Sequence, residues 1–133
     1  MEKLEQENNK YYTPDVSEFY VGFEYEIQNE ENAQWGRFTM MHLDWSDEDR
    51  WDLEEGRIRV KFLDREDIES LEFKHIGAGW YENERGDWKI RKWKKIELDI
   101  WFHYSTTESE VRFRGNIKNK SELVKILKML DIE

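Results

Sequence analysis

The sequence predicts an α+β fold, in which a mostly antiparallel sheet of about six or seven strands carries two or three short helices. Runs of alternating apolar and polar residues recur along the chain, and such alternation is typical of strands with one buried face. The last run is followed by a segment whose apolar residues recur at helical spacing, which predicts a carboxyl-terminal helix packed on the sheet. The 7 Trp, 6 Tyr and 7 Phe residues supply a core although 39% of the residues are charged.

The first elements follow from where the alternation starts. Residues 1–11 are polar and without periodicity, so we expect a frayed or disordered amino terminus and a single domain over residues 12–133. From Tyr20 to residue 27, apolar residues alternate with Gly and Glu, which predicts a strand. Residues 35–43 read as a second strand, the hairpin partner of the first.

Two short helices and one strand are expected in the middle of the chain. Ser46 and Asp49 resemble a capping box at the start of a helix within the acidic segment, residues 44–55. Residues 57–63 alternate as a strand. Asp64 then stands at the N-cap of a short helix.

The remainder predicts an antiparallel meander. Its strands are expected at residues 73–82, broken by a bulge or close backbone approach at Gly77–Gly79, and at residues 88–91, 96–104 and 111–117.

The last two of these strands are expected to form a hairpin in which Tyr104 lies opposite Val111. That register pairs Trp101 with Arg114, and it places Arg112 and Arg114 on one face beside Trp101.

The carboxyl-terminal helix has both a start signal and an apolar stripe. Asn119 is its expected N-cap and Glu122 stands at the capping-box position. The stripe consists of Leu123, Ile126, Leu127 and Leu130.

Composition excludes several classes of protein. Without cysteine, the chain has neither disulfides nor thiol catalysis nor zinc–thiolate sites. No apolar run approaches the ~18 residues of a membrane span, and the acidic, polar start is unlike a secretory signal, so we expect a cytoplasmic protein that needs no membrane.

The net charge of −10 is unevenly distributed. Residues 1–56 hold 4 basic and 16 acidic side chains, whereas residues 57–133 hold 17 and 15. Such asymmetry can mark a surface for a partner, although each charged run is also what a solvated face looks like.

The basic segment at residues 89–95 interleaves five cations with tryptophan, which suits a phosphorylated or nucleotide ligand through charge neutralisation and stacking. Its alternative is a solvated basic turn. The overall charge of −10 opposes binding of long nucleic acids. The candidate ligand-binding residues are Lys92, Trp93, Lys95, Trp101, Arg112 and Arg114.

The acidic segment at residues 44–55 suits a different role. Seven carboxylates with interspersed aromatic anchors could imitate a phosphate track for a basic partner protein, and the alternative is a loop that confers solubility. The candidate partner-binding residues are Trp45, Asp47, Glu48, Asp49, Trp51 and Asp52.

Signals for catalysis are weak. Glu24 and Glu26 share a strand face about 7 Å apart, a spacing that suits a divalent cation or an acid–base pair and equally an ordinary wet face. His42, His75 and His103 lack zinc-site spacing, and nucleophile-elbow, Walker and Rossmann motifs are absent. The sequence therefore points away from an enzyme and assigns no catalytic residue, metal or cofactor.

Three parts of the chain carry a family resemblance: Tyr12–Glu26, Ile58–Leu71 with Trp80–Tyr81 beyond it, and Gly115–Leu123. In this order they resemble a group of small uncharacterised proteins encoded by phages and mobile elements of Bacteroidota. The acidic stretch after Leu43 does not belong to the shared pattern. Small phage accessory proteins often bind a host component stoichiometrically, so the resemblance implies inhibition of a defence enzyme or capture of a signalling nucleotide.

The leading hypothesis is therefore a phage-type accessory protein that binds and inhibits a host macromolecule, with anti-phage defence components among the candidates, and performs no catalysis. The alternative is a sponge that captures a small phosphorylated or nucleotide signal. A carboxylate-dependent hydrolase using Glu24 and Glu26 is a further alternative, and a homo-oligomer is left open.

Overall fold

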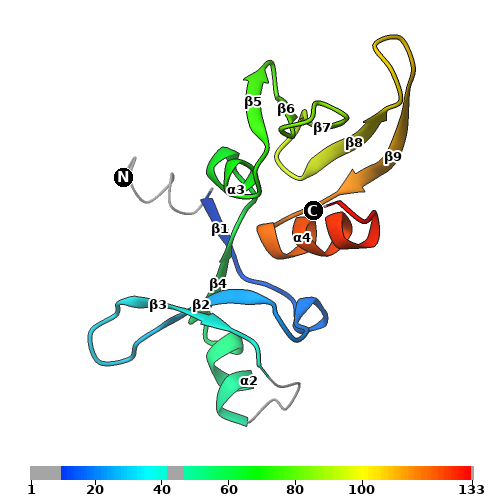
Figure 1. The fold of residues 1–133 in the computed structure, drawn as a ribbon. Coiled ribbons are helices and arrows are strands. Elements are labelled where there is room, and N and C mark those ends of the chain that lie inside the picture. Colours follow the sequence, from blue (N-terminus) through cyan, green and yellow to red (C-terminus); the bar gives the residue numbers. More distant parts are fainter. Residues whose placement is uncertain (1–9, 42–46, 133) are drawn as a thin grey trace. The chain divides into compact units, whose positions relative to one another are not determined.

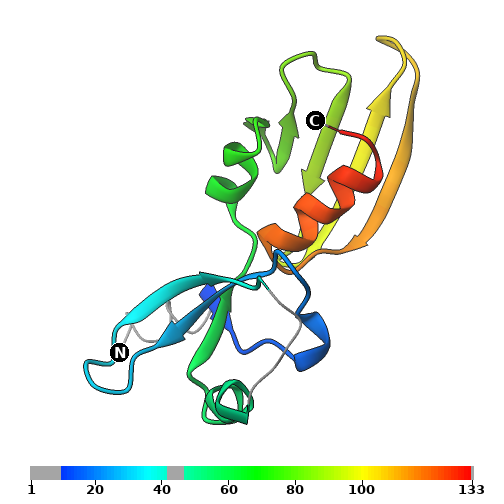
Figure 2. The ribbon, with the colours of Figure 1, turned by 60° about the horizontal axis from the view of Figure 1, so that its bottom comes forward.

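The computed structural model describes residues 10–41 and 47–132, with the backbone alone at residues 47–49. It divides into two compact units, Met1–Lys61 and Phe62–Glu133, and each is described by itself. Both units combine antiparallel strands with helical segments, so the predicted α+β class is confirmed (Figures 1 and 2). The elements of the first unit are β1 (Tyr11–Tyr12), the 3-10 helix η1 (Val16–Glu18), β2 (Glu24–Gln28), β3 (Trp35–Thr39), α2 (Asp47–Glu54) and β4 (Ile58–Lys61). Those of the second are α3 (Arg65–Ser70), β5 (Lys74–Gly77), β6 (Trp80–Glu82), β7 (Trp88–Lys92), β8 (Glu97–His103), β9 (Ser109–Asn116) and α4 (Lys120–Met129).

The first unit is built on a four-stranded antiparallel sheet in the order β1-β4-β2-β3. The predicted hairpin of β2 and β3 is present, with Glu24 opposite Thr39. The strand begins four residues later than the alternation predicts, because Gly22 has a left-handed φ of 99° and turns the chain. Val21 is consequently 55% exposed, whereas Phe23 is fully buried.

Arg59 ties the strands of this sheet together. Its guanidinium lies 3.7 Å from the ring centroid of Tyr11 and 4.0 Å from that of Trp35. Its Nε lies 3.5 Å from a carboxylate oxygen of Glu26. One residue of the Glu24–Glu26 pair is therefore engaged in holding the sheet together, which gives it a structural role.

The predicted acidic helix is present as α2. Gly56 follows it with a φ of 74°, the left-handed conformation that commonly ends a helix. Ser46, the predicted start of its capping box, lies outside the described residues.

The second unit contains the predicted meander, a five-stranded antiparallel sheet in the order β5-β6-β7-β8-β9. α3 and α4 supply apolar residues to the core that lies on one face of this sheet, and Figure 2 shows α4 running across that face. The fully buried members of the core include Ile68, Ile90, Ile100 and Leu123.

Short sequence motifs predicted a close backbone approach and a helix cap in this unit. A Cβ on Gly79 would lie 2.4 Å from the backbone oxygen of Lys92, so the glycine permits the close approach expected here. Asn119 caps α4 by accepting a hydrogen bond from the backbone N–H of Glu122 (2.8 Å), as predicted. Glu122 in turn accepts from the backbone N–H of Lys118 (2.7 Å).

The predicted register of the β8–β9 hairpin is wrong. The structure places Trp101, and not Tyr104, opposite Val111. The turn is tighter than expected because the backbone N–H of Tyr104 donates to the carbonyl of Glu108 (2.9 Å), and the Ser105 hydroxyl accepts from the Glu108 N–H (3.1 Å). Since turn geometry fixes hairpin register, β9 starts earlier and slides along β8.

A β-bulge interrupts the same hairpin. Ile100 lies opposite Phe113, and the next residue of β8, Trp101, lies opposite Val111. Arg112 is left between the paired residues. A bulge of this kind changes which face a side chain occupies, so the expectation that Arg112 and Arg114 share a face does not hold.

Candidate functional site

One face of the five-stranded sheet carries no helix within the described part of the second unit. Cross-strand pairing places two rows of side chains on this helix-free face. In one row Trp80, Arg91, Asp99 and Arg114 lie side by side on β6 to β9, and in the other row Glu82, Lys89, Trp101 and Val111 do so. The opposite face holds the core residues Ile90 and Ile100.

Two tryptophans meet on the helix-free face. The ring centroids of Trp80 and Trp101 are 6.3 Å apart with the planes at 53°. Because the residues come from the strands on either side of β7, their indoles reach toward each other across that strand. Lys89 and Arg91 are two residues apart on β7, about 7 Å, and bracket the indole pair. We call Trp80, Lys89, Arg91 and Trp101 the indole patch.

The two cations of the indole patch are available to an anion. In the part of the chain that the structure describes, neither Lys89 nor Arg91 makes a side-chain hydrogen bond or ion pair. The guanidinium of Arg91 lies 5.5 Å from the Trp80 ring centroid. A surface that holds aromatic planes next to unneutralised cations suits a ligand with both a flat ring and a negative charge.

Arg114 has a different role from these cations. Its Nε and a terminal nitrogen lie 3.0 and 3.4 Å from the two carboxylate oxygens of Asp99, which is only 3% exposed. A forked pair to a buried carboxylate fixes the guanidinium in place and satisfies most of its charge locally. Arg114 therefore lies at the edge of the patch and contributes less net positive charge to it than Lys89 or Arg91.

Two ring nitrogens near the patch are buried without partners. Trp101 Nε1 and His103 Nε2 have no hydrogen-bond partner within the described structure. Burial, followed by the charge of Lys89, lowers the pKa of His103 below its ordinary value of 6.5. The imidazole is therefore uncharged at neutral pH and adds no cation to the patch.

The structure separates the ligand-binding residues that the sequence predicts. Trp101 and Arg114 lie on the helix-free face. Arg112 instead places its guanidinium 5.3 Å from the ring centroid of Phe102, and its terminal nitrogen donates to the Tyr104 hydroxyl (3.1 Å). Its Nε also lies 2.7 Å from Glu110.

The lysines of the basic segment are also engaged elsewhere. Lys92 lies on the side of the buried Leu98, its Nζ donates to the carbonyl of Lys94 (3.1 Å), and burial lowers its pKa. Lys95 places its Nζ 4.1 Å from the ring centroid of Phe62. Trp93 is 45% exposed and lies outside the sheet strands.

Sequence reasoning missed Trp80, and it left Lys89 and Arg91 out of the candidate ligand-binding residues although both belong to the predicted basic segment. Strand alternation could have identified the two cations: residues 89 and 91 flank the apolar Ile90, so both side chains face away from the core. Only cross-strand register, however, brings Trp80 and Trp101 to their two sides.

The partner-binding residues of the acidic segment are described in part. Trp45 lies outside the described residues, as do the side chains of Asp47, Glu48 and Asp49, whose backbone forms the first turn of α2. Trp51 is 48% exposed, and the Arg57 guanidinium lies 4.0 Å from its ring centroid. Asp52 is also engaged by Arg57, at 3.0 Å.

The described residues contain neither a metal-binding cluster nor a membrane-spanning helix. No group of three or more His, Asp or Glu side chains there could hold a metal ion. No helix there is long and apolar enough to cross a membrane.

Comparison with known proteins gave no family. No family model, no curated protein and no solved structure matches this chain.

Proposed function

We propose that this chain is a binding protein that acts without catalysis, and that the indole patch binds a nucleotide or a similar small phosphorylated ring compound. One observation carries the proposal: among the described residues of the unit, two tryptophans and two cations without ion-pair partners lie together on a sheet face that no helix covers. The ligand class is the one expected for the sequence's alternative hypothesis, with a different set of residues.

Each part of the patch has a task in this proposal. A nucleobase stacks on an indole, which contributes about 1–3 kcal/mol per base. Lys89 and Arg91 neutralise the phosphate, and Arg91 can donate two parallel hydrogen bonds to it. The hydrogen-bonded pair of the buried Asp99 and Arg114 joins β8 to β9 beside the patch and holds these side chains in place. Fewer side chains then lose conformational freedom when the ligand binds, which lowers the entropic cost of binding.

The test is calorimetric titration and thermal shift with AMP, ATP and cyclic dinucleotides. We expect at least one of them to bind and raise the melting temperature, because a ligand that binds only the folded state stabilises it. The double substitution of Lys89→Glu with Arg91→Glu should lower affinity about 100-fold, as two favourable charge contacts become repulsive. Trp80→Ala should lower it about tenfold through lost stacking.

The control is Lys94→Glu, a single charge reversal at an exposed cation of the basic segment outside the sheet face. It should leave affinity unchanged. Loss of binding in Lys94→Glu with no loss in the Lys89 and Arg91 double variant would transfer the site to the basic turn and refute the indole patch. Absence of binding by every nucleotide in the panel would refute the proposed function.

A second candidate function rests on helix α2. Trp51 stays half exposed although Arg57 stacks on it, so an aromatic anchor is presented on the acidic helix. This arrangement supports the hypothesis of stoichiometric binding to a host macromolecule with a basic surface. In that case the acidic helix, and not the indole patch, makes the contact.

A further inference from the structure

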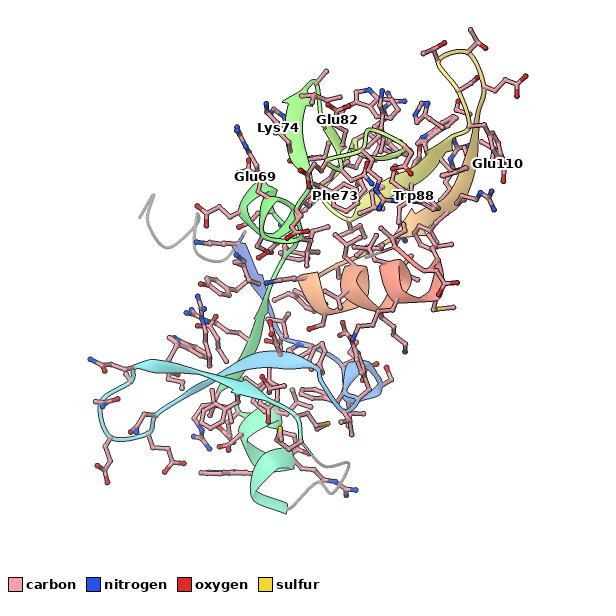
Figure 3. All side chains as sticks on the ribbon, viewed as in Figure 1. Glu69, Phe73, Lys74, Glu82, Trp88 and Glu110 are labelled. Carbon is pink, nitrogen blue, oxygen red and sulfur yellow. The ribbon has the colours of Figure 1, made fainter. Side chains whose placement is uncertain are left out.

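The second unit contains a cavity that neither candidate function uses. Its volume is about 350 Å³, close to the lower end of the ~300–1,000 Å³ range of small-molecule sites. Three segments form it: the residues that follow α3, the turn between β6 and β7, and the residues that follow α4. Figure 3 labels Phe73 and Trp88, the two aromatic residues of its lining.

The lining combines aromatic rings with acidic groups. Trp88 is half-buried and supplies accessible aromatic surface, whereas Phe73 is only 3% exposed and lies behind the wall as part of the core. Four carboxylates line it, those of Glu72, Glu84, Asp87 and Asp131, against a single cation, Arg85. Within the described residues, none of these five charged side chains forms an ion pair. A hollow with an aromatic wall and a surplus of unneutralised carboxylates repels phosphate and attracts cations.

Hydrogen bonds of the Asn83 side chain and of the His103 backbone fix the turn that forms one wall. Asn83 Nδ2 donates to the Asp87 carboxylate (2.8 Å), and Asn83 Oδ1 accepts from the backbone N–H of Trp88 (3.1 Å). The carbonyl of Asp87 also accepts from the backbone N–H of His103 (2.7 Å). These bonds hold Asp87 and Trp88 in place before any ligand arrives, which reduces the cost of binding.

Two helix ends complete the cavity. Glu72 and Asp131 follow α3 and α4, and both have left-handed backbones with φ of 69° and 57°. Glycine or asparagine is usual at such positions because other residues pay a steric cost there. Because these positions hold Glu72 and Asp131 instead, each helix end contributes a carboxylate to the cavity lining.

We infer that this cavity binds an organic cation, an alkylguanidinium or alkylammonium group whose alkyl part packs on Trp88. The Trp88 ring supplies cation–π attraction and the carboxylates accept charged hydrogen bonds. A bare metal ion does not fit, because no three carboxylates or imidazoles in the described residues converge closely enough to hold one. The site is separate from the indole patch and does not depend on the proposed function.

Titration with butylguanidinium and with butylurea, its neutral analogue, tests the cavity at low ionic strength. Calorimetry gives the affinity, and the indole ¹⁵N–¹H resonance of Trp88 reports the location. We expect butylguanidinium to shift this resonance and to bind at least about tenfold more tightly than butylurea. Spermidine and a capped Gly-Arg-Gly peptide then distinguish the source of the cation. Binding of spermidine alone indicates a free polyamine, and binding of the peptide indicates a basic side chain of a partner.

The decisive variant removes charge without altering shape. It combines Glu72→Gln, Glu84→Gln and Asp131→Asn, all at exposed positions, and asparagine suits the left-handed backbone of residue 131. We expect affinity for butylguanidinium to fall at least about tenfold. A matched variant with Glu31→Gln, Glu66→Gln and Glu108→Gln changes the net charge equally and should retain binding. Failure of butylguanidinium to bind, equal binding of butylurea, or equal losses in both variants would overturn the inference.

Discussion

His103 makes the helix-free face sensitive to acid. Its imidazole stands on β8 two residues from Trp101, and its Nε2 is buried without a partner. Burial and then the charge of Lys89 lower its pKa from 6.5, so the folded protein resists adding a proton that the unfolded chain accepts readily. The contribution to stability is therefore present above the unfolded pKa and is lost as the pH falls from there through the folded pKa.

The prediction concerns His103→Gln, which removes this titration. Relative to the variant, the wild type should lose stability as the pH is lowered from about 7 to about 5, while the difference between the two stays constant above about pH 7.5. Urea denaturation at several pH values measures it. Parallel curves over the whole range would contradict the assignment. As a control, Lys89→Gln should raise the pKa of His103 in an NMR titration, because it removes a nearby positive charge.

Single residues differ in how well the sequence predicts them. Asn119 and Gly79 were placed correctly because capping and close backbone approach depend on a few neighbouring residues. Arg112 was misplaced because its face depends on a bulge, and a bulge follows from pairing with another strand. Trp80 and Lys89 were missed for the same reason: only the partner strands show which side chains meet.

At the scale of elements, alternation identified most strands of the second unit, and its meander order followed. Register did not follow, since two alternating strands can slide by two residues without changing their buried faces. The shift is two residues at Phe113, and the bulge makes it three at Val111. The hydrogen bonds of Ser105 and Glu108 in the turn decided it. The chemistry of the cross-strand pairs could not detect the slide, because Arg114 lies opposite Trp101 in the predicted register and opposite Asp99 in the observed one, and both are acceptable partners.

Helix α2 carries the prediction at this scale. The triple substitution of Asp47→Lys, Glu48→Lys and Asp49→Lys reverses three charges and leaves the pair of Asp52 and Arg57 intact. If α2 binds a basic host macromolecule, this variant should lose the partner that wild type retains in affinity capture from bacterial lysate, with at least a tenfold lower affinity for the purified partner, as about 1.4 kcal/mol corresponds to tenfold.

Its control reverses three exposed carboxylates of the second unit, with Glu66→Lys, Glu69→Lys and Glu108→Lys. This control should keep the partner. Equal capture by wild type and the α2 variant would remove the helix from consideration. Equal loss in both variants would show that net charge, and not α2, governs the interaction.

For the whole molecule, the charge asymmetry is smaller between the two units than between the sequence segments compared above, but it persists. Residues 1–61 hold 7 basic and 16 acidic side chains, whereas residues 62–133 hold 14 and 15. The unit with the indole patch is thus almost neutral, and nearly all of the net negative charge belongs to the other unit. The sequence expectation of one domain over residues 12–133 stays a prediction.

This distribution predicts how ligand length and salt act together. Lys89 and Arg91 attract a phosphate over a short range, while the net charge of −10 repels every further phosphate of a strand. In a general nucleic-acid binder, affinity rises with strand length and falls steeply with salt.

Here a thymidine strand of about 20 nucleotides should bind no more tightly per site than one of about three at low salt. The added phosphates are repelled by the negative charge of the protein at distances that the roughly 30 Å Debye length does not screen. Raising the salt to about 0.15 M shortens that length to about 8 Å, so it should weaken binding of the short strand modestly and improve the long strand relative to it. Fluorescence anisotropy with labelled strands measures both. The contrary outcome is a long strand that binds far more tightly at low salt, with a steep salt dependence. It would show that the cations of the indole patch outweigh the net negative charge of the protein, and it would place long nucleic acids among the ligands.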